Sequence, residues 1–151
     1  METLAALLDQ AEAQRNIALA AFNQARARRD GAREQSRDLD QYRHDYTQRW
    51  QAQFQRGAPL DIVRCYHQFA DRLALAVQQQ THAVVVAEQT LSRANDNLAA
   101  HELRVASVRK LIERREQEQR RSSERHEQRS ADELAQRMAS TRRHHFEANP
   151  T

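Results

Sequence analysis

Cys65, Tyr66 and His67 follow one another in the chain, and they include the residue types best suited to nucleophilic catalysis. A cysteine nucleophile needs a histidine base within hydrogen-bond reach. Consecutive residues of a helix point in different directions, so this run forms no pair of nucleophile and base. We therefore expect no catalytic residue here.

Metal and phosphate chemistry also lack the residues that they require. His144 and His145 are adjacent, whereas two histidines that share a metal on one helix are spaced four apart, and no cysteine or carboxylate cluster accompanies them. With only two glycines, the chain has no glycine-rich loop to hold phosphates. We expect a protein that is not an enzyme and that has no metal site and no cofactor.

The composition is that of long helices. Of the 151 residues, 39% are hydrophobic and 30% are charged, and the mean hydropathy is -0.98. The chain is rich in Ala, Gln, Arg, Glu and Leu and has only two glycines and two prolines, which is typical of coiled coils. Its hydrophobic content is too low for a thick core.

The charge pattern and the apolar segments limit the partners and the compartment. The net charge is +3, but basic and acidic residues are interleaved, so we expect no nucleic-acid partner. No segment approaches the roughly 20 apolar residues that cross a bilayer, and the first residues do not resemble a secretory signal. Cys65 is the single cysteine and cannot form an internal disulfide. We expect a cytoplasmic protein with no direct membrane insertion.

Apolar residues recur every seven positions in the first third of the chain, which predicts a helix over about residues 3–55. The alanines in this series allow a partner backbone to come close. A second line of residues, each three positions after a member of the main series, is expected to form the other half of the seam. Polar residues interrupt this second line. The main series is Leu4, Ala11, Ala18, Ala25, Ala32, Leu39 and Tyr46, and the second line is Leu7, Gln14, Ala21, Arg28, Gln35 and Tyr42.

A second and stronger series predicts a helix over about residues 61–143, and its sustained seven-residue repeat implies a left-handed supercoil. Between the two series, RGAPLD at 56–61 is the one cluster of Gly and Pro. Pro59 disfavours helix at Ala58, and Asp61 suits the first turn of a helix, so we expect a turn at 56–60. The second series is Val63, Ala70, Val77, Val84, Leu91, Leu98, Val105 and Ile112.

The two seams have matching lengths. If the chain folds back at the turn, residue numbers on facing levels sum to about 116, and both seams end together at Leu4 and Ile112. The predicted fold is all-α: a long two-helix antiparallel coiled-coil hairpin with a C-terminal helical overhang, forming one domain over residues 1–143. We expect it to be a monomer when isolated.

This register makes two predictions about side chains. Gln35 lies near Gln80, where shared polar residues can fix the register of a coiled coil; the alternative is that both amides reach out to solvent. Arg28 and Arg29 lie near Glu88, as a surface pair that contributes well under about 1 kcal/mol.

The seam ends after Ile112, and no apolar side chain follows in the next stretch. We expect residues from 113 to about 143 to form an unpaired helical overhang of roughly 45 Å. A small apolar face returns there at spacings of three and four, and residues 144–151 are expected to be a disordered tail. The apolar face consists of Ala131, Leu134, Ala135 and Met138.

Four aromatic residues, spaced four apart, precede the turn. Tyr42 and Tyr46 belong to the seam lines, but steps of four advance about 40° per step around a helix, so we expect Trp50 and Phe54 to have rotated off the seam. One interpretation is structural, with bulky residues thickening the core where the hairpin closes. The other is a docking surface, since aromatic residues are enriched at the centres of interfaces. The structural and the docking interpretations are compatible.

The chain resembles the FliJ family, the central stalk of the flagellar type III export ATPase. The resemblance covers most of the chain and is carried by LDQYRHDY at 39–46, YHQFADRLALAVQQQ at 66–80, VRKLIERREQEQRR at 108–121 and ADELAQR at 131–137. It implies a hairpin similar to the rotor subunit of rotary ATPases, bound peripherally to the cytoplasmic face of the inner membrane at the flagellar base.

The resemblance also implies partners. Family members enter the pore of a hexameric flagellar export ATPase and promote its assembly, contact a membrane protein of the export gate, and are described as binding export chaperones. The implied gate-docking residues are Gln35, Leu39, Tyr42, Tyr46, Phe69, Leu73, Ala76 and Gln80. The docking interpretation of the aromatic residues, and not the resemblance, adds Trp50 and Phe54 as a tip contact. The implied contacts with the ATPase ring are Leu4, Leu7, Leu8, Leu134 and Met138.

Two other functions share this pattern. The equivalent stalk of a virulence injectisome would have the same fold and mechanism. A plain structural coiled-coil scaffold would use the seams between chains and would therefore be a dimer.

Overall fold

The computed structural model describes residues 2–147, and these form two helices. Helix α1 spans Glu2–Gln55 and helix α2 spans Leu60–Glu147. The expected all-α hairpin is confirmed. Its contacts divide the chain into two units, one of Gln10–Arg104 and one that joins the first turns of α1, up to Asp9, with α2 from Val105 onward.

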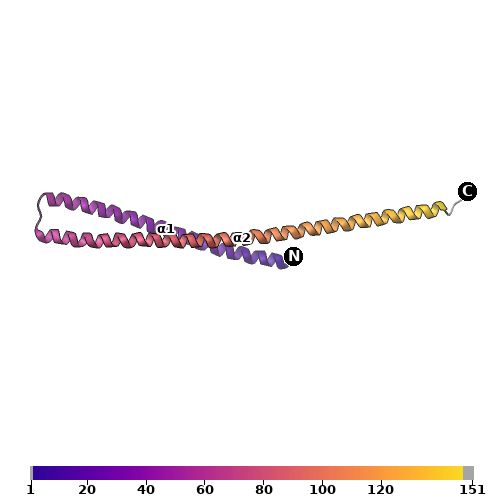
Figure 1. The fold of residues 1–151 in the computed structure, drawn as a ribbon, viewed down its shortest axis with the longest axis horizontal. Coiled ribbons are helices and arrows are strands. Elements are labelled where there is room, and N and C mark those ends of the chain that lie inside the picture. Colours follow the sequence, from indigo (N-terminus) through magenta and orange to yellow (C-terminus); the bar gives the residue numbers. More distant parts are fainter. Residues whose placement is uncertain (1, 148–151) are drawn as a thin grey trace. The chain divides into compact units, whose positions relative to one another are not determined.

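Within the Gln10–Arg104 unit, α1 and α2 lie side by side and run antiparallel (Figure 1). The core between them is thin, because α1 contributes alanines and α2 contributes larger aliphatic residues. Positions of the predicted series on both helices are buried or half-buried. The buried side chains of this unit are Ala11, Ala18, Ala25, Leu73 and Leu98.

The seam of α1 includes a line of residues different from the one expected. The residues three positions beyond the main series are largely exposed, whereas those four positions beyond it are mostly half-buried. In a coiled coil, the second line of the seam can lie either three or four positions after the main series. Packing against the other helix selects the line with the bulkier apolar residues. The half-buried line is Leu8, Arg15, Phe22, Arg29, Ser36 and Trp50.

The turn has the geometry that its glycine and proline predict. The N–H groups of Arg56 and Gly57 donate to the carbonyl oxygens of Gln53 and Phe54 at 3.2 and 3.1 Å, and they close the end of α1. Gly57 has a φ of 89°, a left-handed conformation that is common just after a helix and strained for other residues. The Pro59 carbonyl oxygen then accepts the first hydrogen bonds of α2.

Side-chain contacts confirm the register at one level and correct it at another. The Gln80 amide donates to the Ala32 carbonyl oxygen at 2.9 Å and to the Gln35 amide oxygen at 3.4 Å, as the predicted pairing of Gln35 with Gln80 requires. Glu88, however, pairs with Arg33 at 2.7 Å. Arg29 pairs instead with its neighbour Asp30, at 2.8 Å.

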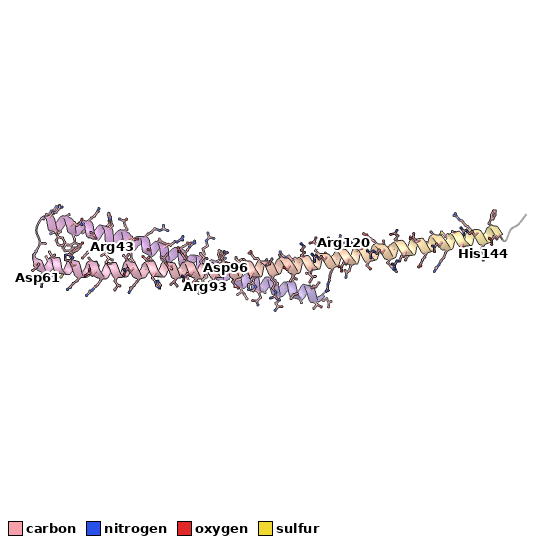
Figure 2. The ribbon with its side chains drawn as sticks, viewed as in Figure 1. Arg43, Asp61, Arg93, Asp96, Arg120 and His144 are labelled. Carbon is pink, nitrogen blue, oxygen red and sulfur yellow. The ribbon has the colours of Figure 1, made fainter. Side chains whose placement is uncertain are left out.

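In the other unit, the first turns of α1 lie against α2 around Val105. Leu4, Val105 and Val108 are buried there, and Ile112 is half-buried. From residue 113 to 147 every side chain is exposed. Figure 2 shows Arg120 and His144 on this part of α2, with no other helix beside them.

Helix α2 ends later than expected. It continues through His144 and Phe146 to Glu147, within the stretch that we expected to be a disordered tail. The physical reason is that no glycine or proline interrupts the sequence before Pro150. The rest of the expected tail, residues 148–151, lies outside the described residues.

Candidate docking surfaces

Six aromatic rings from both helices form one cluster next to the turn. Tyr46 is at its centre, with ring centroids 4.7 Å from Phe69 and 5.6 Å from Tyr66. Tyr42 stacks on Tyr46 from the side away from the turn, at 6.3 Å. The sequence placed these residues near each other through the turn, and the packing joins the rings into one aromatic layer.

Trp50 and Phe54 belong to this cluster, and the prediction that they lie off the seam was wrong. The Trp50 ring is 6.0 Å from Tyr66, and the Phe54 ring meets the edge of Tyr66 at 5.0 Å. Trp50 continues the half-buried line of α1, which differs from the line that the sequence predicted. Both side chains therefore help to close the hairpin, while their half-buried state leaves part of each accessible.

The Tyr46 hydroxyl is electrostatically perturbed. Burial raises the pKa of Tyr46 above its usual value of 10.0, and the nearby Tyr42, Tyr66 and Cys65 side chains raise it further, because each can become an anion. Tyr46 therefore remains neutral over a wider range of pH than an exposed tyrosine. A neutral phenol suits a residue that is packed among other rings.

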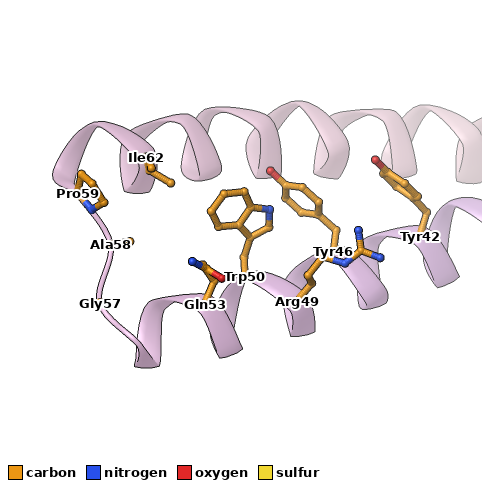
Figure 3. Close-up of a pocket in the computed structure, with 9 residues that line it drawn as sticks. All are labelled: Tyr42, Tyr46, Arg49, Trp50, Gln53, Gly57, Ala58, Pro59 and Ile62. Atoms are coloured by element: carbon orange, nitrogen blue, oxygen red, sulfur yellow. The ribbon is translucent and has the colours of Figure 1, made fainter.

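A hollow of about 370 Å³ lies under the bend. In Figure 3 the rings of Trp50, Tyr46 and Tyr42 follow one another along α1, and Arg49 lies next to Tyr46. The loop and the start of α2 form the other side. The residues around the hollow are Tyr42, Tyr46, Arg49, Trp50, Gln53, Gly57, Ala58, Pro59 and Ile62.

The eight predicted gate-docking residues are brought together on the hairpin, but they differ in exposure. Tyr42 and Phe69 are 52% and 38% exposed, and Gln35 is also exposed. Leu39, Tyr46, Ala76 and Gln80 are half-buried, and the Gln80 amide is bonded across the seam. Leu73 is buried in the core, so its side chain supports this surface and is not available on it.

Sequence reasoning missed Arg49 and Ile62, which line the hollow. Arg49 follows Tyr42 by seven residues and Ile62 precedes Phe69 by seven, so both continue the lines on which exposed docking residues were predicted. The available signal was this seven-residue step.

The predicted ATPase-ring residues fall into two groups. Leu4 is buried, and Leu7 and Leu8 are half-buried, in the first turns of α1. Leu134 and Met138 are 55% and 57% exposed on the stretch of α2 where every side chain is accessible. Leu4 therefore mainly holds α1 against α2, whereas Leu134 and Met138 are free to contact a partner.

The residues considered for catalysis and metal binding lie apart. Cys65 is exposed and is not part of a disulfide, and the His67 ring packs against the edge of the Tyr66 ring at 5.3 Å. Among the described residues, no group of three His, Cys, Asp or Glu side chains could hold a metal ion. Within the same range, neither helix has a stretch long and apolar enough to span a membrane.

A family model described as "Flagellar FliJ protein" matches residues 1–144. This match covers both helices up to the last turn of α2. No curated protein and no solved structure was found to match the chain.

Proposed function

Because the chain belongs to the FliJ family and is thus a component of the flagellar export apparatus, we propose that it is the central stalk of the export ATPase complex. In this role it enters the hexameric ATPase ring, promotes ring assembly and activity, and connects the ring with the export gate at the cytoplasmic face of the inner membrane. Its own contribution is mechanical and not enzymatic.

The observation that carries the proposal is the long exposed stretch of α2. A single helix is only about 10–12 Å wide with its side chains, so it fits a narrow pore. Arginines and glutamates are interspersed along residues 113–130, which keeps this helix soluble without a partner. Exposed Leu134 and Met138 supply apolar contacts further along, and half-buried Leu7 and Leu8 can add to the ring contact from α1.

The gate would dock on the exposed side of the aromatic cluster. Tyr42, Phe69 and Gln35 present accessible atoms, while Leu39, Tyr46, Ala76 and Gln80 support them. Leu73 acts from below by holding the helices together. Trp50 and Phe54 extend the same surface toward the turn. Aromatic groups that are fixed by packing lose little conformational freedom on binding, which favours a specific contact.

The family match distinguishes the flagellar stalk from an injectisome stalk, and the molecular mass in solution distinguishes it from a dimeric scaffold. A match to a flagellar family favours the flagellar system over a virulence injectisome. A plain scaffold would pair its seams between chains, so light scattering would report a dimer. The hairpin seam is satisfied within one chain, and a monomer is expected at micromolar concentration.

The test is to mix the protein with the hexameric export ATPase of the same flagellar system, and separately with the soluble domain of its gate protein. We expect more hexamer and faster ATP turnover in the first mixture and a stable complex in the second. An ATPase that forms hexamers and turns over ATP equally well without the protein would overturn the stalk assignment. Export chaperones of the same system are further partners to examine by the same binding assay.

A further inference from the structure

Two lengthwise flanks border the seam of the Gln10–Arg104 unit, and they differ in what covers them. The Arg33 flank is crossed by the ion pair of Arg33 with Glu88, which joins the two helices. The Tyr42 flank, on the opposite side of the seam, carries exposed Tyr42 and Phe69. In this unit an ion pair joins the two helices on the Arg33 flank, whereas on the Tyr42 flank the long hydrogen bond from Gln80 to Gln35, at 3.4 Å, joins them and the Tyr42 and Phe69 side chains stay exposed.

The Tyr42 flank is built from two seven-residue series, one on each helix. Neither series contains a carboxylate, and the α2 series consists of apolar residues and one threonine. Ile62 and Phe69 of this series are 40% and 38% exposed. The series are Arg28, Gln35, Tyr42 and Arg49 on α1, and Ile62, Phe69, Ala76, Ala83 and Thr90 on α2.

This flank is hollowed at two places, and an arginine lies at each. Arg49 borders the hollow of about 370 Å³ under the bend. A second hollow, of about 340 Å³, is lined by Arg28 and by the exposed Val86. Arg28 and Arg49 are three heptads apart, a distance of about 31 Å along a helix.

The charges of the two flanks also differ. Counting the flanking lines and the lines next to them over residues 26–93, the Tyr42 flank has four arginines and two aspartates. These are Arg28, Arg49, Arg72 and Arg93 against Asp38 and Asp45. The Arg33 flank is balanced, with Arg26, Arg33, Arg37 and Arg64 against Asp30, Asp40, Asp71 and Glu88. The Tyr42 flank is therefore the basic one, and it complements an acidic partner.

We propose that the Tyr42 flank takes an acidic amphipathic helix of about three heptads from a partner protein. The apolar residues of this helix sit in the two hollows, and its carboxylates meet Arg28 and Arg49. The inference rests on the proposed function in one respect: this flank includes the gate-docking surface, and the inference names the chemistry of the segment that docks there.

A helix is the expected occupant of the Tyr42 flank for two reasons: the residues of the flank repeat every seven positions, and the backbone groups of α1 and α2 are already bonded. Both sides of the flank repeat every seven residues, and an α-helix that lies along them repeats with the same period. An extended strand needs unpaired backbone groups at its docking edge, whereas the backbone groups of α1 and α2 are bonded within each helix. The mode of recognition is therefore that of a third helix joining a coiled coil.

Trp50 provides the readout, because it is the only tryptophan of the chain and lines the hollow under the bend. The probe is a synthetic peptide of three heptads, free of tryptophan, with leucine at the two seam positions and glutamate at the two flanking positions. A second peptide with lysine in place of glutamate is the matched control. Titration of the full chain with the glutamate peptide should change the Trp50 emission to saturation, and the effect should weaken with added salt.

Charge reversal locates the site. Arg28→Glu combined with Arg49→Glu should weaken binding of the glutamate peptide roughly tenfold or more and should improve binding of the lysine peptide. Arg26→Glu combined with Arg37→Glu, on the Arg33 flank, makes the same change in net charge and should leave the affinity nearly unchanged. Equal binding of the two peptides, or equal loss of affinity in the two double variants, would refute the proposal.

Failure of this inference can be told apart from failure of the proposed function. If the gate domain binds and Tyr42→Ala weakens it, but the glutamate peptide does not bind, the flank is a gate site with another chemistry. If the peptide binds with the expected charge dependence but the gate domain does not, the chemistry of the flank stands and the gate assignment fails.

Discussion

At the scale of single residues, the two glycines have opposite roles. Gly57 ends α1 in a left-handed conformation with a φ of 89°. Gly31 lies in the middle of α1, and a methyl group added there would meet no other atom within 4 Å. A glycine inside a helix lowers stability because it gives up more conformational freedom on folding than alanine does. Only Gly57 is therefore required by the fold.

Alanine at the two positions should shift stability in opposite directions. Gly31→Ala should raise the free energy of unfolding by about 0.5–1 kcal/mol. Gly57→Ala should lower it by about 1–2 kcal/mol, because alanine is strained in the left-handed region. Urea unfolding followed by circular dichroism measures both changes. Equal effects of the two substitutions would contradict the assigned roles.

Tyr46 should make the stability sensitive to alkaline pH. Burial, and then the neighbouring Tyr42, Tyr66 and Cys65, raise its pKa above 10.0 in the folded protein. An unfolded chain releases this proton near pH 10, whereas the folded chain holds it to higher pH. Between the two pKa values the folded state binds more protons, so stability falls as pH rises, and the contribution is fully present below pH 10.

Tyr46→Phe removes this titration. In thermal unfolding between about pH 9 and pH 11, the parent should lose more stability than the variant as the pH rises. At neutral pH the two proteins should unfold at similar temperatures, which controls for the lost hydroxyl. The same alkaline decline in both proteins would show that Tyr46 does not contribute to it.

At the scale of the helices, exposure separates residues that hold α1 and α2 together from residues that meet a partner. Leu73 and Phe69 were both predicted to dock the gate, yet Leu73 is 7% exposed and Phe69 is 38% exposed. They are one turn apart on α2, and only their position relative to the seam distinguishes them. Substitution at these two positions should therefore have different consequences.

Leu73→Ala should lower the free energy of unfolding by about 2 kcal/mol or more, because it leaves a cavity in the seam. Phe69→Ala, alone or with Tyr42→Ala, should have a smaller effect on unfolding but should weaken gate binding. Urea unfolding and titration with the gate domain measure the two quantities. A Phe69→Ala variant that binds the gate normally and has lost helicity would favour a purely structural role for the aromatic cluster.

The sequence predicted the helices and the main seam because a seven-residue repeat is a direct record of what a coiled coil buries. The turn followed from Gly57 and Pro59, and the pairing of Gln35 with Gln80 followed from the matched lengths of the seams. The second line of α1 could not be chosen in this way, since Leu7 and Leu8 are both leucines and the choice depends on packing against α2. The partner of Glu88 and the burial of Trp50 depended on that choice.

The sites were less accessible to prediction than the fold. Periodicity indicates which residues face the seam, but the flank that carries an ion pair between the helices can be told from the other only once the pairing of Arg33 with Glu88 is known. The hollow under the bend depends on the path of residues 57–59, which no repeat describes. Arg49 could be recognised as part of a surface only after this path was seen.

At the scale of the whole molecule, the two units offer chemically distinct surfaces. The Gln10–Arg104 unit carries an aromatic and basic flank, and the other unit carries the exposed stretch of α2 from residue 113 to 147. A protein that couples two molecular machines needs two such surfaces, and a substitution in one surface should leave binding at the other unchanged. The buried seam residues of both units lie before residue 113, so the exposed stretch contributes little to folding.

The central claim is that the exposed stretch of α2 acts on the ATPase ring, and the most direct measurement compares ATP turnover of the export ATPase with two forms of the protein. The full chain should stimulate turnover. A chain that ends after Ile112 should keep its folded hairpin, seen as unchanged cooperative unfolding, and its gate binding, but should no longer stimulate. Full stimulation by this folded, truncated chain would contradict the account.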